Sequence, residues 1–93
     1  MALLSDAQIS EALKNLPDWE RAGDEIVRSV RFPDFMAGIA AINRIAEAAE
    51  AADHHPDIDI RYRNVRFVLS THVEGGLTEK DMQMARQIDE IVK

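Results

Sequence analysis

The chain contains no cysteine. Disulfide bonds, thiolate metal sites and a cysteine nucleophile are therefore excluded. Aromatic residues are also scarce, at 5% of the 93 residues, with one tryptophan and one tyrosine. Because 46% of the residues are hydrophobic, the chain can still bury one modest core, and we expect a single domain over residues 1–93.

Long apolar runs and an excess of positive charge are absent as well. No segment reaches the roughly 18 apolar residues that a membrane span requires. The first residues, Met1 to Asp6, lack the basic and apolar regions of a signal peptide. A net charge of −6 argues against binding to nucleic acid or to an anionic membrane. We therefore expect a soluble cytoplasmic protein.

Histidine is rare, but its three copies are concentrated in one part of the chain. His54, His55 and His72 lie in a stretch that begins at Glu50 and ends at Asp81. Histidine is the only side chain whose unperturbed pKa, about 6.5, allows proton transfer in both directions near neutrality. Proton-transfer chemistry is therefore expected between residues 50 and 81.

Capping signals and periodicity predict the elements of the first half. Ser5 and Gln8 fit a capping box, so a helix should begin at Ser5, and Pro17 should end it. Residues 18–32 are typical of a hairpin, with Trp19 in its first strand and a turn at 22–24. Pro33 fits the first turn of a second helix. Two neighbouring apolar stripes follow: Phe35, Ile39, Ile42, Ala46 and Ala49, and Gly38, Ala41, Ile45, Ala48 and Ala52. Such a helix is expected to be covered on two sides, by the sheet and by another subunit.

After Pro56 the apolar period changes to two, which predicts a second hairpin. A turn at Arg63–Asn64 would keep the apolar face in register. The predicted pairs are Tyr62 with Val65, Ile60 with Phe67 and Ile58 with Leu69. Extending this ladder places His55 opposite His72, so the histidines should cluster in space.

The last segment predicts a third helix, with Thr78 and Asp81 at its cap and Met82, Ala85 and Ile88 on its apolar face. The element order is then α-β-β-α-β-β-α. Strand pairs separated by single helices favour an α+β fold, a four-stranded antiparallel sheet with three helices on one face.

The histidine stretch has a recognisable spacing. Glu50, three residues, His54-His55-Pro56, five residues, Tyr62, nine residues, His72, eight residues and Asp81 resemble the signature of the pterin-4a-carbinolamine dehydratase family. The resemblance extends to Leu16–Trp19, Phe32–Phe35 and Thr71–Thr78. It implies an α+β subunit in a homodimer or homotetramer, with neither a metal nor an organic cofactor.

The resemblance also implies a reaction, the removal of water from 4a-hydroxytetrahydrobiopterin to give the quinonoid dihydropterin, in support of tetrahydropterin recycling. This reaction is general acid/base work, for which imidazoles are suited. By resemblance, His54 and His72 would be the acid/base pair, and His55 would help to hold the pterin. Four further residues match substrate-binding positions of the family: Trp19, Glu50, Pro56 and Asp81.

Several of these residues have alternative interpretations. Asp81 stands where a helix cap expects an acid, so its role could be structural. Trp19 would by composition be a core residue, and Tyr62 is expected to pack at the hairpin end. Two other functions also stay open at this point. Three histidines could form a zinc site. Relatives of the family also act as non-enzymatic partners of aromatic amino acid hydroxylases or transcription factors.

Overall fold

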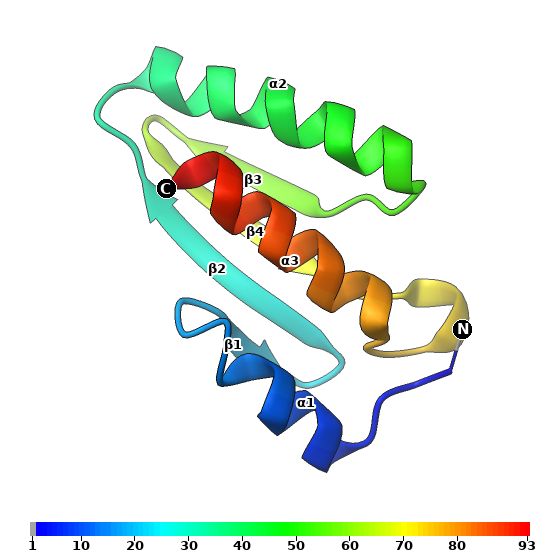
Figure 1. Ribbon diagram of the computed structural model, residues 1–93. Helices are drawn as coiled ribbons and strands as arrows, with labels where there is room; N and C mark the ends of the chain where they lie inside the picture. The colour runs from blue at the N-terminus through cyan, green and yellow to red at the C-terminus, as the bar shows by residue number, and fades with distance from the viewer. Residues whose placement is uncertain (1) are drawn as a thin grey trace.

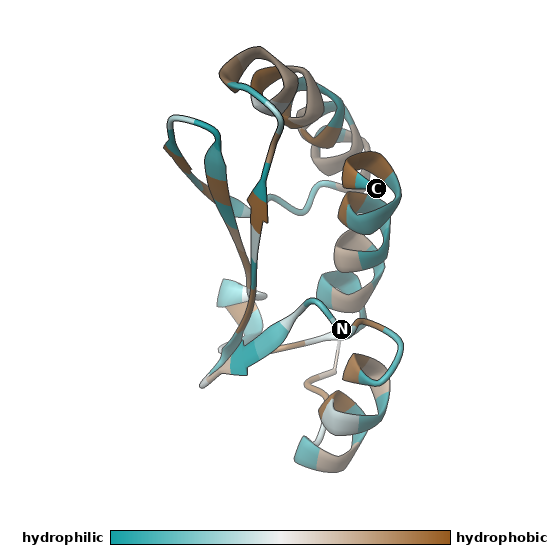
Figure 2. Ribbon diagram, turned by 90° about the vertical axis from the view of Figure 1, so that its left-hand side faces the viewer, coloured by the Kyte–Doolittle hydropathy of each residue, from teal (hydrophilic) through white to brown (hydrophobic). Residues whose placement is uncertain are grey.

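The computed structural model, which describes residues 2–93, contains one four-stranded antiparallel sheet with helices on one of its faces (Figures 1 and 2). The strand order is β1-β2-β4-β3. The elements are α1 (Asp6–Leu13), β1 (Glu20–Ala22), β2 (Glu25–Arg31), α2 (Phe35–Ala52), β3 (Asp57–Arg61), β4 (Asn64–Leu69), the short 3₁₀ helix η1 (His72–Glu74) and α3 (Glu79–Val92). The predicted fold class and element order are confirmed.

The first helix begins as predicted but ends early. Ser5 caps it, and its side chain accepts a hydrogen bond from the Gln8 backbone in a complete capping box. The helix ends at Leu13, not at Pro17. The residue before a proline is disfavoured in the α conformation, so the helix cannot continue to Pro17. After Leu13 the chain forms i→i+3 hydrogen bonds instead, such as the one from Leu16 N to Leu13 O at 3.0 Å.

Two further boundaries differ from the prediction. Strand β1 begins at Glu20, so Trp19 precedes the strand. The second helix begins at Phe35, and Pro33 lies outside its first turn. The reason is that Asp34 is a stronger cap: its Oδ1 accepts a hydrogen bond from Ala37 N at 2.7 Å.

The buried face of α2 comes mainly from the stripe that begins with Gly38. Gly38, Ala41 and Ile45 of this stripe are buried, and Ala49 of the other stripe is buried beside them. The rest of that other stripe is less covered, since Phe35 is 43% exposed and Ala46 is exposed as well. Small residues let α2 lie close to its neighbour α3, which runs beside it in the opposite direction (Figure 1).

The register of the second hairpin was predicted wrongly by two residues. Ile60 pairs with Val65 and Ile58 with Phe67, and the turn is formed by Tyr62 and Arg63. Tyr62 adopts a positive φ of 56°, which a search for glycine or asparagine at the turn would not find. Because the error is an even number, the apolar residues still face the helices. The predicted pairing of His55 with His72 is wrong, since the β3–β4 ladder extends no further than Asp57 and Val68.

The core lies between the sheet and the helices. Phe67, Leu69 and Ile26 from the sheet have no exposed surface, and neither have Met82 and Ile88 from α3. Arg28 is a polar residue on this face of the sheet, and it forms an ion pair with Asp89 near the end of α3. The packing fixes α3 across the sheet, and its first turn therefore lies beside the loop 70–78.

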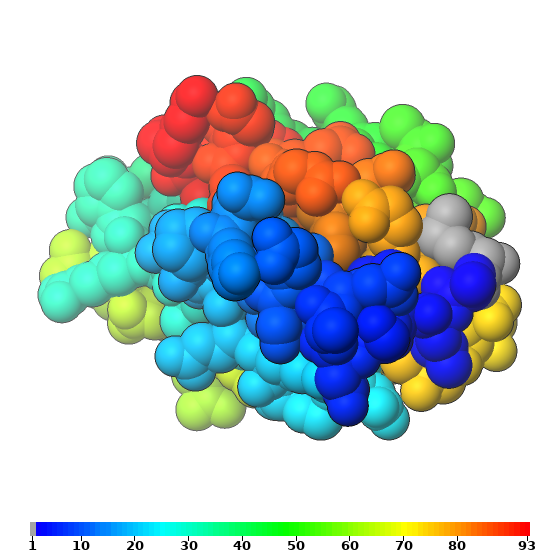
Figure 3. Space-filling view, turned by 60° about the horizontal axis from the view of Figure 1, so that its bottom comes forward, coloured from blue at the N-terminus to red at the C-terminus, as the bar shows by residue number. Residues whose placement is uncertain are grey.

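The N-terminal segment contacts the same loop. Leu4 N donates to Leu77 O at 2.9 Å. Figure 3 shows this segment, in dark blue, against the gold loop residues. A Cβ atom on Gly76 would lie 3.1 Å from Leu3, which indicates how closely the two segments approach. None of the helices within residues 2–93 is both long and apolar enough to cross a membrane.

Candidate active site

The three histidines line one surface cavity of about 370 Å³, a volume within the roughly 300–1,000 Å³ that small-molecule sites occupy. The lining residues are Asp53, His54, His55, Ser70, Thr71, His72, Val73 and Lys80. They come from the end of α2, the segment before β3, the loop around η1 and the first turn of α3. The predicted spatial cluster is confirmed, although the hairpin ladder does not create it.

The end of α2 directs His54 toward this cavity. Asp53 ends the helix in the left-handed conformation, with φ 50° and ψ 43°. His54 N then donates to Ala49 O at 3.1 Å, which is the longer hydrogen bond of a Schellman motif. The chain therefore leaves the helix abruptly, and the side chain of His54 turns back toward α3.

His54 contacts a buried carboxylate. Its Nε2 lies 2.6 Å from Oδ1 of Asp81. The side chain of His54 is 10% exposed and that of Asp81 is fully buried. The other oxygen of Asp81 accepts hydrogen bonds from Thr78 N at 2.9 Å and from the hydroxyl of Thr71 at 2.8 Å. Asp81 thus caps α3, as its position in the sequence indicated, and its other oxygen contacts the ring of His54.

His55 has a separate carboxylate partner. Its Nε2 lies 3.0 Å from Oε2 of Glu50, and both side chains are exposed, at 55% and 77%. This contact is accessible to solvent and contributes little rigidity. His54 and His55 therefore use different acids. Within residues 2–93 no group of three or more His, Asp or Glu side chains is arranged to hold a metal ion.

His72 stands at the start of η1 and is exposed. Its loop is held by the backbone of Thr71, whose carbonyl accepts hydrogen bonds from Glu74 N and Gly75 N, both at 3.0 Å. Gly75 has a φ of 77°, which glycine adopts without strain and which closes this turn. A buried histidine and an exposed histidine thus border the same cavity.

The other sequence-predicted residues lie at varying distances from the cavity. Trp19 is 4% exposed, and its indole nitrogen donates to Asp89 at 2.8 Å. Asp89 is eight residues beyond Asp81 on α3, a helical distance of about 12 Å. Trp19 is therefore not brought to the histidine cavity, and a pterin contact for it stays a prediction. Pro56 is half-buried before β3, and Tyr62 is 68% exposed in the hairpin turn.

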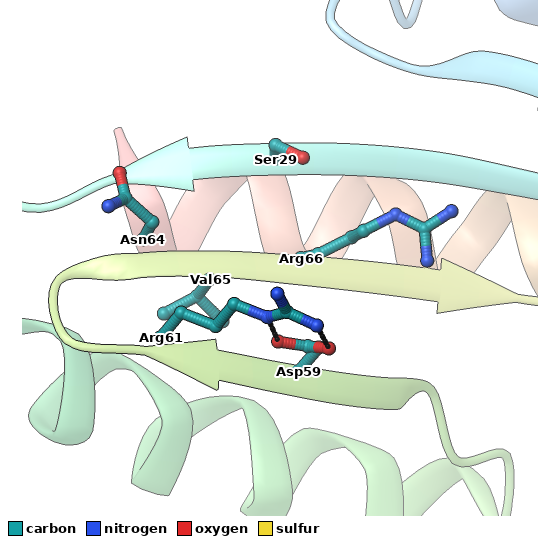
Figure 4. A pocket seen from close by; sticks show the side chains of 6 residues that line it. All are labelled: Ser29, Asp59, Arg61, Asn64, Val65 and Arg66. Atoms are coloured by element: carbon teal, nitrogen blue, oxygen red, sulfur yellow. Dashed lines mark hydrogen bonds and ion pairs between the residues drawn. The ribbon is translucent and has the colours of Figure 1, made fainter.

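Two other hollows are larger but contain no histidine. One, of about 420 Å³, lies on the open face of the sheet and is lined by Ser29, Asp59, Arg61, Asn64, Val65 and Arg66. Figure 4 shows Arg61 turned toward Asp59, with which it forms a hydrogen bond of 3.1 Å. The other, of about 440 Å³, adjoins Arg28 and Asp89. Since neither contains a histidine, acid/base chemistry near neutrality favours the smaller cavity.

Sequence reasoning gave no catalytic role to several residues of the site. Thr71 and Thr78 fall within a segment that resembles the family, but nothing in the spacing indicated that they contact Asp81. Lys80 precedes Asp81 and reaches the cavity. A signal for Thr78 existed, because it occupies the cap position of α3, whereas Thr71 became visible only when the loop and helix were brought together.

Comparisons with known proteins agree with this geometry. Residues 2–91 match the family described as "Pterin 4 alpha carbinolamine dehydratase". A protein of Mycobacterium sp. strain KMS named "Putative pterin-4-alpha-carbinolamine dehydratase" is 63% identical over 92 residues, covering 99% of this chain and 98% of that protein. A protein of the same name from Nocardia farcinica is 62% identical over 91 residues, covering 98% and 96%.

A solved structure is also similar over nearly the whole chain. The crystal structure of a transcriptional coactivator/pterin dehydratase from Brucella melitensis superposes with a TM-score of 0.96 at 35% identity. The match covers 99% of this chain and 100% of that one. With the fold, the histidine cavity and these relatives in agreement, the chain belongs to the pterin 4 alpha carbinolamine dehydratase family.

Proposed function

We propose that this protein is a dehydratase that removes water from a 4a-hydroxytetrahydropterin, such as 4a-hydroxytetrahydrobiopterin, and so supports recycling of a tetrahydropterin cofactor. The observation that carries the proposal is the convergence of all three histidines on one cavity in a chain of this family. No other hollow described above offers a group that exchanges protons readily near neutrality.

The dehydration requires two proton transfers. The bond between C4a and the hydroxyl oxygen breaks, and the oxygen leaves as water once it has received a proton. A ring nitrogen loses its proton, and the electron pair released forms the new carbon–nitrogen double bond. One acid and one base held on either side of the ring would each accelerate this elimination, typically by 10²–10⁴-fold.

His54 and His72 are proposed as this acid/base pair. The ring of His54 has a fixed orientation, because its Nε2 lies 2.6 Å from the buried carboxylate of Asp81. His72 lines the same cavity from a short loop and is exposed, which suits proton exchange with solvent. His55, with its partner Glu50, is proposed to hold the pterin through hydrogen bonds.

The test is to generate the 4a-carbinolamine with a separate phenylalanine hydroxylase and to follow its decay by ultraviolet absorbance. We expect the wild-type protein to accelerate the decay in proportion to its concentration. A decay rate equal to that in buffer alone, measured with folded protein, would contradict the proposed function. Retained pterin binding in that case would favour a binding role.

We also propose that the subunit forms a homodimer or homotetramer. Four large apolar side chains are exposed at the start of α2 and the end of the second hairpin: Phe35 (43%), Met36 (69%), Ile60 (43%) and Tyr62 (68%). Hydrogen bonds hold these two regions together, for example from Phe32 N to Arg63 O at 2.9 Å. Exposed large apolar side chains that gather in one region are typical of an interface.

Self-association can be measured by light scattering coupled to gel filtration. We expect a mass that is a multiple of the subunit mass, and we expect Met36→Glu to lower it, because the substitution would bury a charge in the contact. The matched control is Glu47→Asp, a conservative change elsewhere on α2. A wild-type protein that elutes as a monomer across the concentration range would refute this proposal.

A further inference from the structure

A buried chain of hydrogen bonds runs from the cap of α3 to His54. The hydroxyls of Thr78 and Thr71 lie 2.8 Å apart, Thr71 Oγ1 lies 2.8 Å from Asp81 Oδ2, and Asp81 Oδ1 lies 2.6 Å from His54 Nε2. Thr78 and Asp81 are fully buried, Thr71 is 6% exposed and His54 is 9% exposed. A buried network of this kind destabilises the fold unless each donor has an acceptor, so each proton is expected to lie in one particular hydrogen bond.

Proton counting gives the chain a direction. An ionised carboxylate can only accept hydrogen bonds, and a hydroxyl has a single proton to donate. The proton of Thr71 therefore points to Asp81, and Thr78 must donate its own proton to Thr71. Asp81 Oδ2 receives a second hydrogen bond from Thr78 N at 2.9 Å. This oxygen thus accepts two hydrogen bonds, one from Thr71 and one from Thr78.

The direction of the chain determines the tautomer of His54. Because Oδ1 of an ionised Asp81 can only accept, the His54 nitrogen that faces it, Nε2, has to carry a proton. A neutral imidazole protonated at Nε2 has a free electron pair at Nδ1. Among residues 2–93, no hydrogen bond is formed by Nδ1, and the ring borders the cavity. Nδ1 is then the atom of His54 that can take a proton from a bound molecule.

The backbone of Thr71 also supports the loop that carries His72, the second histidine of the site. Its carbonyl accepts from Glu74 N and Gly75 N, both at 3.0 Å, and its amide donates to Gly76 O at 2.9 Å. These hydrogen bonds form the turn that begins with His72. One residue therefore supports the partner of His54 with its hydroxyl and the loop of His72 with its main chain.

We propose that Thr71 is a positioning residue, whose hydroxyl, supported by Thr78, holds Asp81 so that His54 keeps its proton on Nε2 and presents Nδ1 as the base. This inference rests on the proposed dehydratase function, because it assigns an atom to the base of that reaction. Thr71 itself is not proposed to transfer a proton to or from the substrate.

The first test reads the tautomer of the wild-type protein directly. Nitrogen-15 spectra of the histidine rings would be recorded at alkaline pH, where histidine is ordinarily neutral, with His55→Gln and His72→Gln used for assignment. We expect His54 to carry its proton on Nε2 and to have an unprotonated Nδ1. A proton on Nδ1, or protons on both nitrogens, would overturn the proposal. This reading requires no substrate and is independent of dehydratase activity.

The second test compares Thr71→Val with Thr71→Ser. Valine keeps the branched shape that suits the extended backbone of residue 71 but has no hydroxyl, whereas serine retains it. We expect valine to lower kcat about 10- to 100-fold, the effect of losing one hydrogen bond to a charged group, with a smaller change in KM. Serine should restore most of the loss. The tautomer signal of His54 should be altered in the valine variant alone.

The outcomes separate this inference from the proposed function. A wild-type protein without dehydratase activity would contradict the function, while the nitrogen-15 spectrum would still decide the tautomer. An active Thr71→Val variant with wild-type kcat, or a serine variant as slow as the valine variant, would overturn the role of the hydroxyl. If valine at position 71 prevents folding, Thr78→Val provides the same comparison, with a smaller expected loss because Thr78 N still donates to Asp81.

Discussion

Replacement of both His54 and His72 by alanine is expected to reduce the acceleration of carbinolamine dehydration by at least about 10²–10⁴-fold, the usual contribution of one general acid or base. The two side chains are the proposed proton-transfer pair of the cavity that both of them line, and no other histidine except His55 is available to replace them. The rate of decay of the ultraviolet signal measures the effect. The single variants should each be impaired, and their effects should not be additive, because residues that act as a unit lose most activity in the first substitution.

His55→Ala is the matched control. It removes the same kind of side chain from the same cavity, but His55 is half-exposed and its partner Glu50 is outside the core. We expect this variant to raise KM more than it lowers kcat. Wild-type acceleration by the His54→Ala, His72→Ala protein would contradict the histidine mechanism while leaving the family assignment intact. Circular dichroism at the assay temperature would establish that each variant is folded.

Substitution of Asp81 by asparagine is expected to lower kcat by about 10²–10⁴-fold. The change is isosteric, but the carboxamide presents two protons where the carboxylate presented only electron pairs. It cannot accept from Thr71, Thr78 and His54 together, as the carboxylate does. An amide that faces His54 with its NH₂ group would favour the opposite tautomer of the ring, and a comparable tautomer error in a serine protease costs about 10⁴-fold.

The same substitution should also lower stability. At least one buried donor would lose its acceptor, at a cost of about 1–3 kcal/mol in the free energy of unfolding. A urea titration would measure the change. Glu79→Gln is the control, because it exchanges a carboxylate for an amide in the same turn of α3 at a partly exposed position that pairs only with Arg86 among the residues described. Wild-type kcat in the asparagine variant would mean that Asp81 only caps the helix.

The sequence predicted some local features correctly and others wrongly, for identifiable reasons. The capping box at Ser5 and the apolar faces of the strands and α3 depend on neighbours within a few residues, so spacing was sufficient to find them. The hairpin register failed because Tyr62 adopts a positive φ, a conformation that its residue type does not signal. Likewise, Pro33 fitted the first turn of α2, but Asp34 forms the N-cap and the helix begins one residue later.

The site divides in the same way. The spacing from Glu50 to Asp81 was sufficient to indicate the family, because the residue types and intervals are themselves the signal. It could not indicate that Glu50 serves His55 while Asp81 serves His54, since that choice depends on where α2 ends and where α3 begins. Trp19 is a residue for which the family resemblance and the structure differ. The resemblance predicted it at the site, whereas its indole contacts Asp89 near the C-terminal end of α3.

The sequence alone therefore determined the fold class, the element order and the residues in which the chemistry should be sought, because these depend on local propensity, apolar periodicity and residue type. Only the tertiary structure decided which carboxylate contacts which histidine, and only it brought Thr71 and Thr78 into the site. The physical reason is that α3 is held against the sheet by a shared apolar core, which brings its buried first turn within hydrogen-bond distance of a loop and of the end of α2. Contacts of that kind follow from packing between distant segments, which sequence spacing does not encode.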